Sequence, residues 1–284
     1  MKHLLTAIIV VIISLGYSQD KSLLWEINGN GLKQPSYLFG TIHIIPKKDY
    51  FFYDSFKEKL DKCKTLTLEV DMNALTLQQK VDMAKKALMP AGENLQNLMG
   101  EERYTAFKKY MIDSIGVSEK KINKKYNRIK PFFLMGLILK DKLGKIKTYE
   151  VELTKYAKKN KMNITGLEKI EDQLSLVETI SLKDQAEQFL QVEELSQYDE
   201  LLRLYLEQDL YGLQTFSEQP DMDYGTDFEA NFITDRNTNW IPTIESLITQ
   251  KATFIAVGAL HLPGENGVIT LLRDKGYSVS PVIN

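Results

Sequence analysis

The sequence predicts an α/β (α+β) fold in which a mixed central sheet, built from strands at both ends of the chain, carries a large helical insert. Three observations lead to this prediction. Extended apolar patterns occur near residues 23–71 and 253–283, helical periodicity dominates from about 74 to 248, and no internal repeat or low-complexity linker divides the chain. We therefore expect a single domain over residues 20–284.

Residues 1–19 have the pattern of a secretory signal peptide. A basic start at Lys2 precedes an apolar stretch from Leu4 to Leu15, and the small residues Gly16 and Ser18 supply a cleavage pattern. The apolar stretch is too short to span a bilayer, and no later segment approaches a second span. We therefore expect an exported protein, periplasmic or secreted, with no stable membrane span after leader cleavage. An uncleaved anchor is the alternative.

About 265 residues remain after the leader, enough for one large domain with a hydrophobic core. The net charge of −2 becomes −3 when the leader removes Lys2. Because such a chain lacks the basic surface that nucleic acids require, we expect no nucleic-acid partner. Cys63 is the only cysteine, so no internal disulfide can form, and the apolar run after it predicts a small buried hydrophobe.

The N-terminal part predicts three strands. Residues 23–28 alternate apolar and polar side chains, Gly-Asn-Gly at 29–31 breaks the pattern, and residues 36–43 resume it, which indicates a β-hairpin. Residues 65–71 form the third predicted strand. Its end carries the carboxylates of Glu69 and Asp71.

The middle of the chain predicts helices, because apolar residues recur there every three or four positions. A short β-like run at 162–165 precedes Glu168. The expected helix interruptions are residues 89–92, Gly116 with Ser118 as an N-cap, Pro131 and Pro220.

The C-terminal part returns to strand and helix. Residues 253–257 form a wholly apolar strand of the kind that is buried on both faces. A helix is expected from Pro263 to about Asp274, with Gly276 as its cap, and residues 277–283 form the last strand. Strands at both ends of the chain are therefore expected to share one sheet.

Outside the leader the chain has two histidines, and each closes the same pattern, Gly-x-x-His. His43 follows Gly40 and His261 follows Gly258, in each case after a strand-like run. Glycine lets another segment or a ligand approach closely, and open α/β sheets place their sites at strand ends. We therefore expect both imidazoles at one shared site, together with Glu69.

These side chains suit a divalent metal ion. Zinc, manganese, cobalt and iron(II) accept two imidazoles together with one or two carboxylates as ligands. Glu69 would supply one carboxylate, and Glu168 could supply a second. A bound ion would lower the pKa of its water and polarise a carbonyl, and a spare carboxylate could move the proton. Arg236 could face a carboxylate or a developing oxyanion.

Plainer interpretations exist for each residue. A buried histidine is more often a hydrogen-bonded core residue than a ligand. Glu69 and Asp71 could be solvated residues at a strand end, and Glu168 could be a carboxylate favoured by a helix N-terminus. Arg236, between Asp235 and Asn237, could belong to an exposed charged turn.

Several motifs follow one another along the chain from about Leu23 to Val282, and each is weak alone while their order and spacing are specific. They are Trp25-Glu-Ile, Tyr37-Leu-Phe-Gly-Thr-Ile-His43, Leu68-Glu-Val-Asp71, Gly166-Leu-Glu168 followed by Gln173, Asp235-Arg-Asn237, Val257-Gly-Ala-Leu-His-Leu-Pro-Gly264, Leu271-Leu-Arg273 and Gly276-Tyr277. Together they resemble the TraB/PrgY/GumN family, which includes the animal Tiki proteins.

The resemblance implies a metal-dependent hydrolase with a mixed sheet split between the chain's ends and a helical middle. Carried over by position, His43, His261 and Glu69 are the implied metal ligands, and the ion is Mn, Co or Zn. The implied catalytic residues are Glu69, Arg236 and Glu168, with Glu69 as a metal ligand or the general base. Asn237 would help to hold its helix in place.

Two positions depart from the family pattern. Thr148-Tyr149-Glu150 stands where the family has Gly-x-Asp before a helix, and Glu168 is followed by Lys169 where the family has threonine. The leading hypothesis is an exported metalloprotease that cleaves a peptide or protein substrate with a metal-activated water. The alternatives are a non-catalytic periplasmic binder of metal, haem or a peptide signal in the same cleft, and a structural envelope protein with core histidines.

Overall fold

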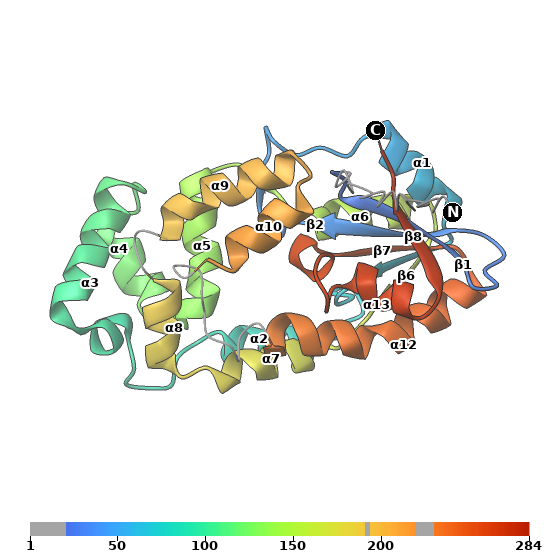
Figure 1. The fold of residues 1–284 in the computed structure, drawn as a ribbon. Coiled ribbons are helices and arrows are strands. Elements are labelled where there is room, and N and C mark those ends of the chain that lie inside the picture. The colour runs from blue at the N-terminus through green and yellow to red at the C-terminus, as the bar shows by residue number, and fades with distance from the viewer. Residues whose placement is uncertain (1–20, 191–193, 220–229, 284) are drawn as a thin grey trace, which may run out of the picture.

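The structure, a computed structural model, describes residues 21–190, 194–219 and 230–283. The expected signal peptide and Pro220 lie outside these ranges. A sheet and its covering helices form one part of the molecule, and a group of helices extends away from one edge of the sheet (Figure 1). The predicted mixed α/β fold is confirmed, with strands from both ends of the chain in one sheet.

The main sheet has six strands in the order β6-β4-β7-β2-β1-β8. The strands β6, β4, β7 and β2 are parallel to one another, whereas β1 pairs antiparallel with both β2 and β8. The predicted hairpin is β1 and β2, with Leu24 opposite Phe39. The bounds are β1 Leu24–Gly29, β2 Ser36–Thr41, β4 Thr65–Leu68, β6 Asn163–Gly166, β7 Thr253–Gly258 and β8 Tyr277–Pro281.

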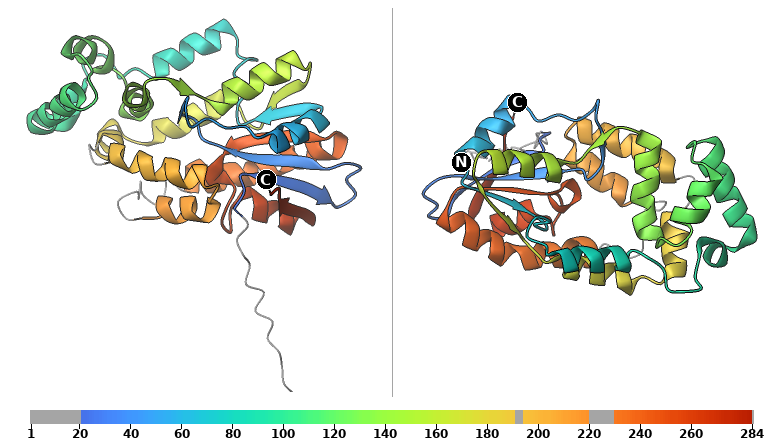
Figure 2. Two further views of the ribbon diagram at one scale, coloured as in Figure 1. Left: turned by 90° about the horizontal axis from the view of Figure 1, so that it is seen from above. Right: turned by 180° about the vertical axis from the view of Figure 1, so that it is seen from behind.

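Helices cover both faces of this sheet. Figures 1 and 2 show α1 (Asp54–Lys62) and α6 (Tyr149–Lys159) on one face, with α12 (Asp235–Gln250) and α13 (Val268–Asp274) on the other. The core between the layers is aromatic on the α6 side, where the ring of Phe39 makes T-shaped contacts with those of Phe56 and Tyr149. The parallel strands β2, β4 and β7 end at the edge of the sheet that faces the other helices (Figure 1).

The remaining helices lie beyond that edge. Those within residues 95–143 and 182–189 contain a second hydrophobic cluster, which includes Leu95, Phe107 and Leu134. Those within residues 194–217 add buried side chains to the core next to the sheet. A small two-stranded sheet of β3 (Ile45–Pro46) and β5 (Ile146–Lys147) accompanies them. The helices are α2 Leu77–Lys86, α3 Leu95–Asp113, α4 Glu119–Lys121, α5 Pro131–Leu143, α7 Ile170–Thr179, α8 Leu182–Phe189, α9 Glu194–Leu206 and α10 Leu210–Ser217. Within the described ranges, no helix is long and apolar enough to cross a membrane.

Local chain signals set several element ends as predicted. Ser118 caps α4 by accepting a hydrogen bond from the Lys121 N–H, and Pro131 is the first residue of α5. Gly276 has a φ of 90° after α13, a conformation that favours glycine. These ends follow from residue chemistry that acts within a few positions of the chain.

Other boundaries differ from prediction. The C-terminal helix begins at Val268, not Pro263, because Gly264 has a φ of 86°, which a helix does not allow. The third strand ends at Leu68, because the Glu69 carbonyl accepts hydrogen bonds from Leu167 and Glu168 and the chain then turns away. Within the helical insert, β6 matches the predicted β-like run at 162–165, whereas β5 was not predicted.

Candidate functional site

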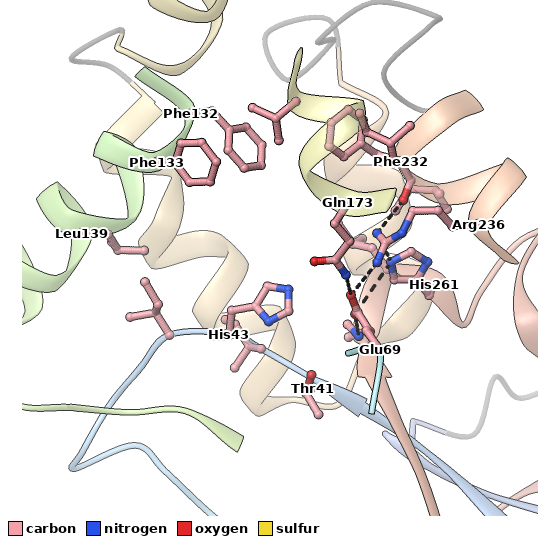
Figure 3. A pocket seen from close by; sticks show the side chains of 18 of the residues that line it. Thr41, His43, Glu69, Phe132, Phe133, Leu139, Gln173, Phe232, Arg236 and His261 are labelled. Carbon is pink, nitrogen blue, oxygen red and sulfur yellow. Dashed lines mark hydrogen bonds and ion pairs between the residues drawn. The ribbon is translucent and has the colours of Figure 1, made fainter. Parts of the chain in front are cut away.

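A buried polar cluster lies at the edge where β2, β4 and β7 end. Glu69 follows β4, His261 ends a short 3-10 turn after β7, and Arg236 lies in the first turn of α12 (Figure 3). The strands are in register here, since Thr41 pairs with Gly258 and Leu68 with Ala256. The sheet topology therefore brings together residues that are far apart in the sequence.

Glu69 is held on both carboxylate oxygens. Its Oε1 accepts a hydrogen bond of 2.8 Å from the Gly258 backbone N–H. Its Oε2 accepts hydrogen bonds of 2.6 Å from Arg236 Nη2 and 3.1 Å from Gln173 Nε2. With only 9% of Glu69 exposed, the carboxylate is fixed and largely desolvated.

The two motif glycines allow the close approach that the sequence predicts. A Cβ at Gly40 would lie 3.1 Å from the Ala259 Cα and 3.2 Å from the Ala259 Cβ, so β2 can approach the 3-10 turn only without a side chain there. At Gly258 a Cβ would lie 3.4 Å from Glu69 Oε1, an ordinary contact. Gly40 therefore serves packing, and Gly258 presents its N–H to the carboxylate.

Arg236 is enclosed by the two glutamates. Its guanidinium donates to Glu168 through Nε and Nη2, and Nη1 donates to the Phe232 carbonyl. The guanidinium carbon Cζ also lies 4.7 Å from the centre of the Trp240 ring. The Nε1 of Trp240 donates a hydrogen bond to Glu168. Because the Arg236 side chain is only 11% exposed, the interpretation that it belongs to an exposed charged turn is wrong. Its hydrogen bond to Glu69 holds that carboxylate in position.

His261 is buried and its tautomer follows from its partners. Asn237 donates through Nδ2 to the carbonyls of His261 and Asn266, so its Oδ1 accepts from His261 Nδ1 at 2.7 Å. The unprotonated Nε2 then lies 3.2 Å from Arg236 Nη1 and 3.9 Å from Glu69 Oε1. Asn237 thus links α12 to the His261 segment and orients the ring.

Burial and charge set the protonation of this pair. Burial lowers the pKa of His261 to about 3, so the ring is neutral at pH 7. Burial alone would raise the pKa of Glu69, but the neighbouring His261, His43 and Arg236 and the Gly258 N–H lower it to about 2. Since His261 is itself neutral at pH 7, Arg236, the Gly258 N–H and the charge of His43 are the partners that keep Glu69 ionised there.

His43 lines the same cavity as Glu69 and His261, and it has a carboxylate partner that its motif does not reveal. Its Nδ1 lies 2.9 Å from Glu150 Oε1, which also accepts from the Thr41 hydroxyl at 3.2 Å. The His43 side chain is 68% exposed. Contact with the protein desolvates only part of this exposed ring and opposes protonation, but the hydrogen bond and charge of Glu150 outweigh it and raise the pKa of His43 to about 9.

Sequence reasoning missed the role of Glu150 and the Trp240 contact. Glu150 lies in the first turn of α6, which Thr148 caps by accepting from the Val151 N–H. The departure from Gly-x-Asp at Thr148-Tyr149-Glu150 was the available signal, since it keeps a carboxylate at that position. Trp240 is fully buried in α12 and has no local pattern that marks it as a partner of Glu168.

The donor chemistry of the cluster suits a cation, although the ligands do not converge. Within the described ranges, no group of three His, Cys, Asp or Glu side chains is arranged to hold a metal ion. His261 Nε2 and Glu69 Oε1, 3.9 Å apart, could be two ligands of one ion at about 2.0–2.2 Å each. Completing the set requires His43 to turn toward that pair.

The cluster forms one end of a cavity of about 640 Å³. The cavity extends from the sheet edge into the helical part, between α2, α5, α7 and α9. Figure 3 shows Phe132, Phe133 and Leu139 across the cavity from Glu69 and His261. A volume of this size is typical of small-molecule and substrate sites.

The fold and this cluster define an α/β protein with a buried carboxylate, imidazole and guanidinium at the carboxyl edge of its parallel strands. Residues 23–281 match the TraB/PrgY/gumN family, and the chain belongs to that family. The motifs from Trp25 to Tyr277 lie within the matched range. The helical residues that complete the site lie within the same matched range.

Curated relatives include metalloproteases. The chain is 23% identical over 321 residues to Metalloprotease TIKI1 of Danio rerio, covering 92% of this chain and 63% of the relative. It is 24% identical over 326 residues to Metalloprotease TIKI1 of Xenopus tropicalis, covering 92% of this chain and 62% of the relative. The chain thus spans less than two thirds of their length, and no solved structure matches it.

Proposed function

We propose that this protein is an exported metal-dependent hydrolase that cleaves a peptide bond in a peptide or protein substrate. The observation that carries the proposal is the fixed Glu69 carboxylate, with Oε1 3.9 Å from the unprotonated Nε2 of His261. Both groups face a cavity that also receives His43. The two relatives named as metalloproteases support the choice of reaction.

The proposed ligands are Glu69, His261 and His43, with manganese, cobalt or zinc as the ion. Electrostatics support this, because Glu69 and Glu168 share the Arg236 guanidinium and Glu150 binds His43. Once His43 gives up its proton to bind the ion, three carboxylates face one fixed cation in the cluster. A bound divalent ion would activate water and polarise the scissile carbonyl. Metal binding requires an ionised carboxylate and neutral imidazoles. Glu69 and His261 are in these states at pH 7, whereas His43, whose pKa is raised to about 9, releases a proton when the ion binds.

The surrounding residues hold these groups in place. Arg236 and the Gly258 N–H fix Glu69, Asn237 fixes the His261 tautomer, and Glu150 restrains His43 through Nδ1. A strongly acidic carboxylate is a weak general base, because an efficient base has a pKa near the working pH. We therefore assign Glu69 the ligand role. Glu168, bound to Arg236, is a positioning residue.

The test is hydrolysis of a peptide library by purified protein, with added Mn²⁺, Co²⁺ or Zn²⁺ and with chelator. We expect metal-dependent cleavage that is lost in Glu69→Gln and His43→Ala. Glu58→Gln, an exposed glutamate at 62%, is the matched control and should keep full activity. Equal behaviour of wild type and His43→Ala with and without chelator would refute the proposal.

A second candidate is a non-catalytic binder of metal, haem or a peptide signal in the same cavity. The observation that favours it is Arg236 Nη1, 3.2 Å from His261 Nε2, since this cation stands beside the atom that would ligate the ion. Tight binding without turnover of any library peptide would support the binder. Export, the other part of the proposal, is tested by N-terminal sequencing of the mature protein, which should begin near residue 20.

A further inference from the structure

The cavity beside the polar cluster has one charged end, and the rest of its wall is apolar. Among the described residues that line it, charge at pH 7 is confined to Glu69, Arg236 and the protonated ring of His43, all at the sheet edge. The far walls, from four separate helices, are aliphatic and aromatic. Examples are Met83, Phe133, Leu139, Leu174, Val177 and Leu201.

The polar side chains along this wall already have partners within the protein. The Tyr198 hydroxyl donates to the Ile44 carbonyl, and the Tyr205 hydroxyl donates to the Gly40 carbonyl. Thr41 donates to Glu150, and the Gln173 amide donates to both Glu69 and Glu168. The wall therefore offers few hydrogen bonds to an occupant away from the cluster.

This wall selects against a peptide backbone and for a hydrocarbon. Each peptide unit that entered would place an N–H and a C=O against apolar side chains, and an unpaired buried amide costs about 1–3 kcal/mol. A saturated chain has no such groups and gains from every buried methylene. The volume of about 640 Å³ also exceeds what a single amino-acid side chain needs.

We propose that the substrate of this site is an N-acylated peptide whose hydrocarbon chain occupies the cavity, with the peptide part at the sheet edge. The inference rests on the proposed hydrolase function and names its substrate class. The acyl chain lies among α2, α5, α7 and α9, and its amide group lies near Glu69 and His261. The charged end of the cavity suits the polar part of such a molecule.

Binding tests this without turnover. Isothermal titration calorimetry of chelator-treated protein compares acetyl, hexanoyl and dodecanoyl forms of one triglycine amide. Each methylene moved into the cavity tightens binding about fourfold, and dodecanoyl has about ten more than acetyl. Allowing for the ordering of the chain, we expect at least about 100-fold tighter binding of the dodecanoyl peptide.

Two substitutions in α5 locate the chain. Leu139→Trp adds bulk to the cavity wall and should weaken dodecanoyl-peptide binding at least about tenfold. Leu137→Trp is the matched control, because Leu137 is 37% exposed, does not line the cavity and lies two positions away on the same helix. It should leave binding unchanged. If Leu139→Trp does not fold, the chain-length series on the unaltered protein decides the matter.

Three results would overturn the inference: affinity that does not rise with chain length, equal affinity of the two tryptophan variants, or dodecanoate that binds as tightly as the dodecanoyl peptide. The last would show that the peptide part adds nothing. Failure of the proposed function is distinguishable, because it removes hydrolysis in the library assay and leaves the chain-length dependence of binding intact.

Discussion

Replacement of Arg236 by methionine tests whether the buried ion-pair network is a structural requirement. Arg236 and its partners Glu69 and Glu168 each have side chains 11% exposed, with Nη2 2.6 Å from both carboxylates. Methionine retains part of the packing on Trp240 but leaves two carboxylates without their cation. Removing one partner of a buried ion pair costs about 3–5 kcal/mol.

We expect Arg236→Met to lower the free energy of unfolding at pH 7 by about 3 kcal/mol, measured by urea unfolding with chelator present. For a chain of this size that corresponds to a fall of about 6–12 °C in Tm. Salt should not remove the difference, because the network is screened little by solvent ions.

The matched control is Arg203→Met. Arg203 also binds two carboxylates, of Glu200 and Glu207, at 2.6 Å each, but its side chain is 51% exposed. Solvent screens such a pair, so this variant should unfold nearly as the wild type does. Equal losses of stability in the two variants would refute the claim that burial makes the Arg236 network important.

Three further predictions follow from single residues. Burial lowers the pKa of His261 from 6.5 to about 3, so its contribution to stability is complete above pH 6.5 and is lost as the pH falls toward 3. When the pH falls from 7 to 4.5, the free energy of unfolding of the wild type, measured in urea, should fall by about 2–3 kcal/mol more than that of His261→Gln. Equal falls in the two proteins would contradict the claim that the buried His261 causes this pH dependence. Gly40→Ala should destabilise the protein by about 1–3 kcal/mol, because the new Cβ would lie 3.1 Å from Ala259 Cα. Gly258→Ala should destabilise it less, since its Cβ would make an ordinary contact. A lower Tm for Gly258→Ala than for Gly40→Ala would contradict this packing. Burial raises the pKa of Cys63 to about 12, so native protein should react slowly with iodoacetamide at pH 8, and mass spectrometry that shows rapid labelling would disprove it.

The parts of the fold that the sequence predicts are those with local causes. Extended residue patterns mark β2, β4 and β7, although the predicted strands over 36–43 and 65–71 continue past the ends of β2 and β4. The glycine breaks mark the hairpin and the end of α13. The Gly-x-x-His pattern also indicates where His43 and His261 lie, because strand ends of parallel neighbours meet at one edge of a sheet. The metal and catalytic roles remain predictions.

The parts that the sequence leaves open depend on long-range packing. Glu150 reaches His43 only because α6 covers the sheet face next to β2, and the sequence separation between them is 107 residues. Arg236 was expected to face a carboxylate or an oxyanion, and only the fold shows that two carboxylates take up its donors. The apolar cavity is likewise formed by helices that no local pattern assigns to one another.

Anomalous X-ray diffraction from crystals grown with Mn²⁺ or Co²⁺ tests the central claim most directly. The account predicts one strong peak at about 2.0–2.3 Å from both His261 Nε2 and Glu69 Oε1, with His43 turned to complete the ligand set. The absence of an anomalous peak at this edge of the sheet, in crystals grown with the metal in large excess over the protein, would contradict the claim that the site binds a metal ion.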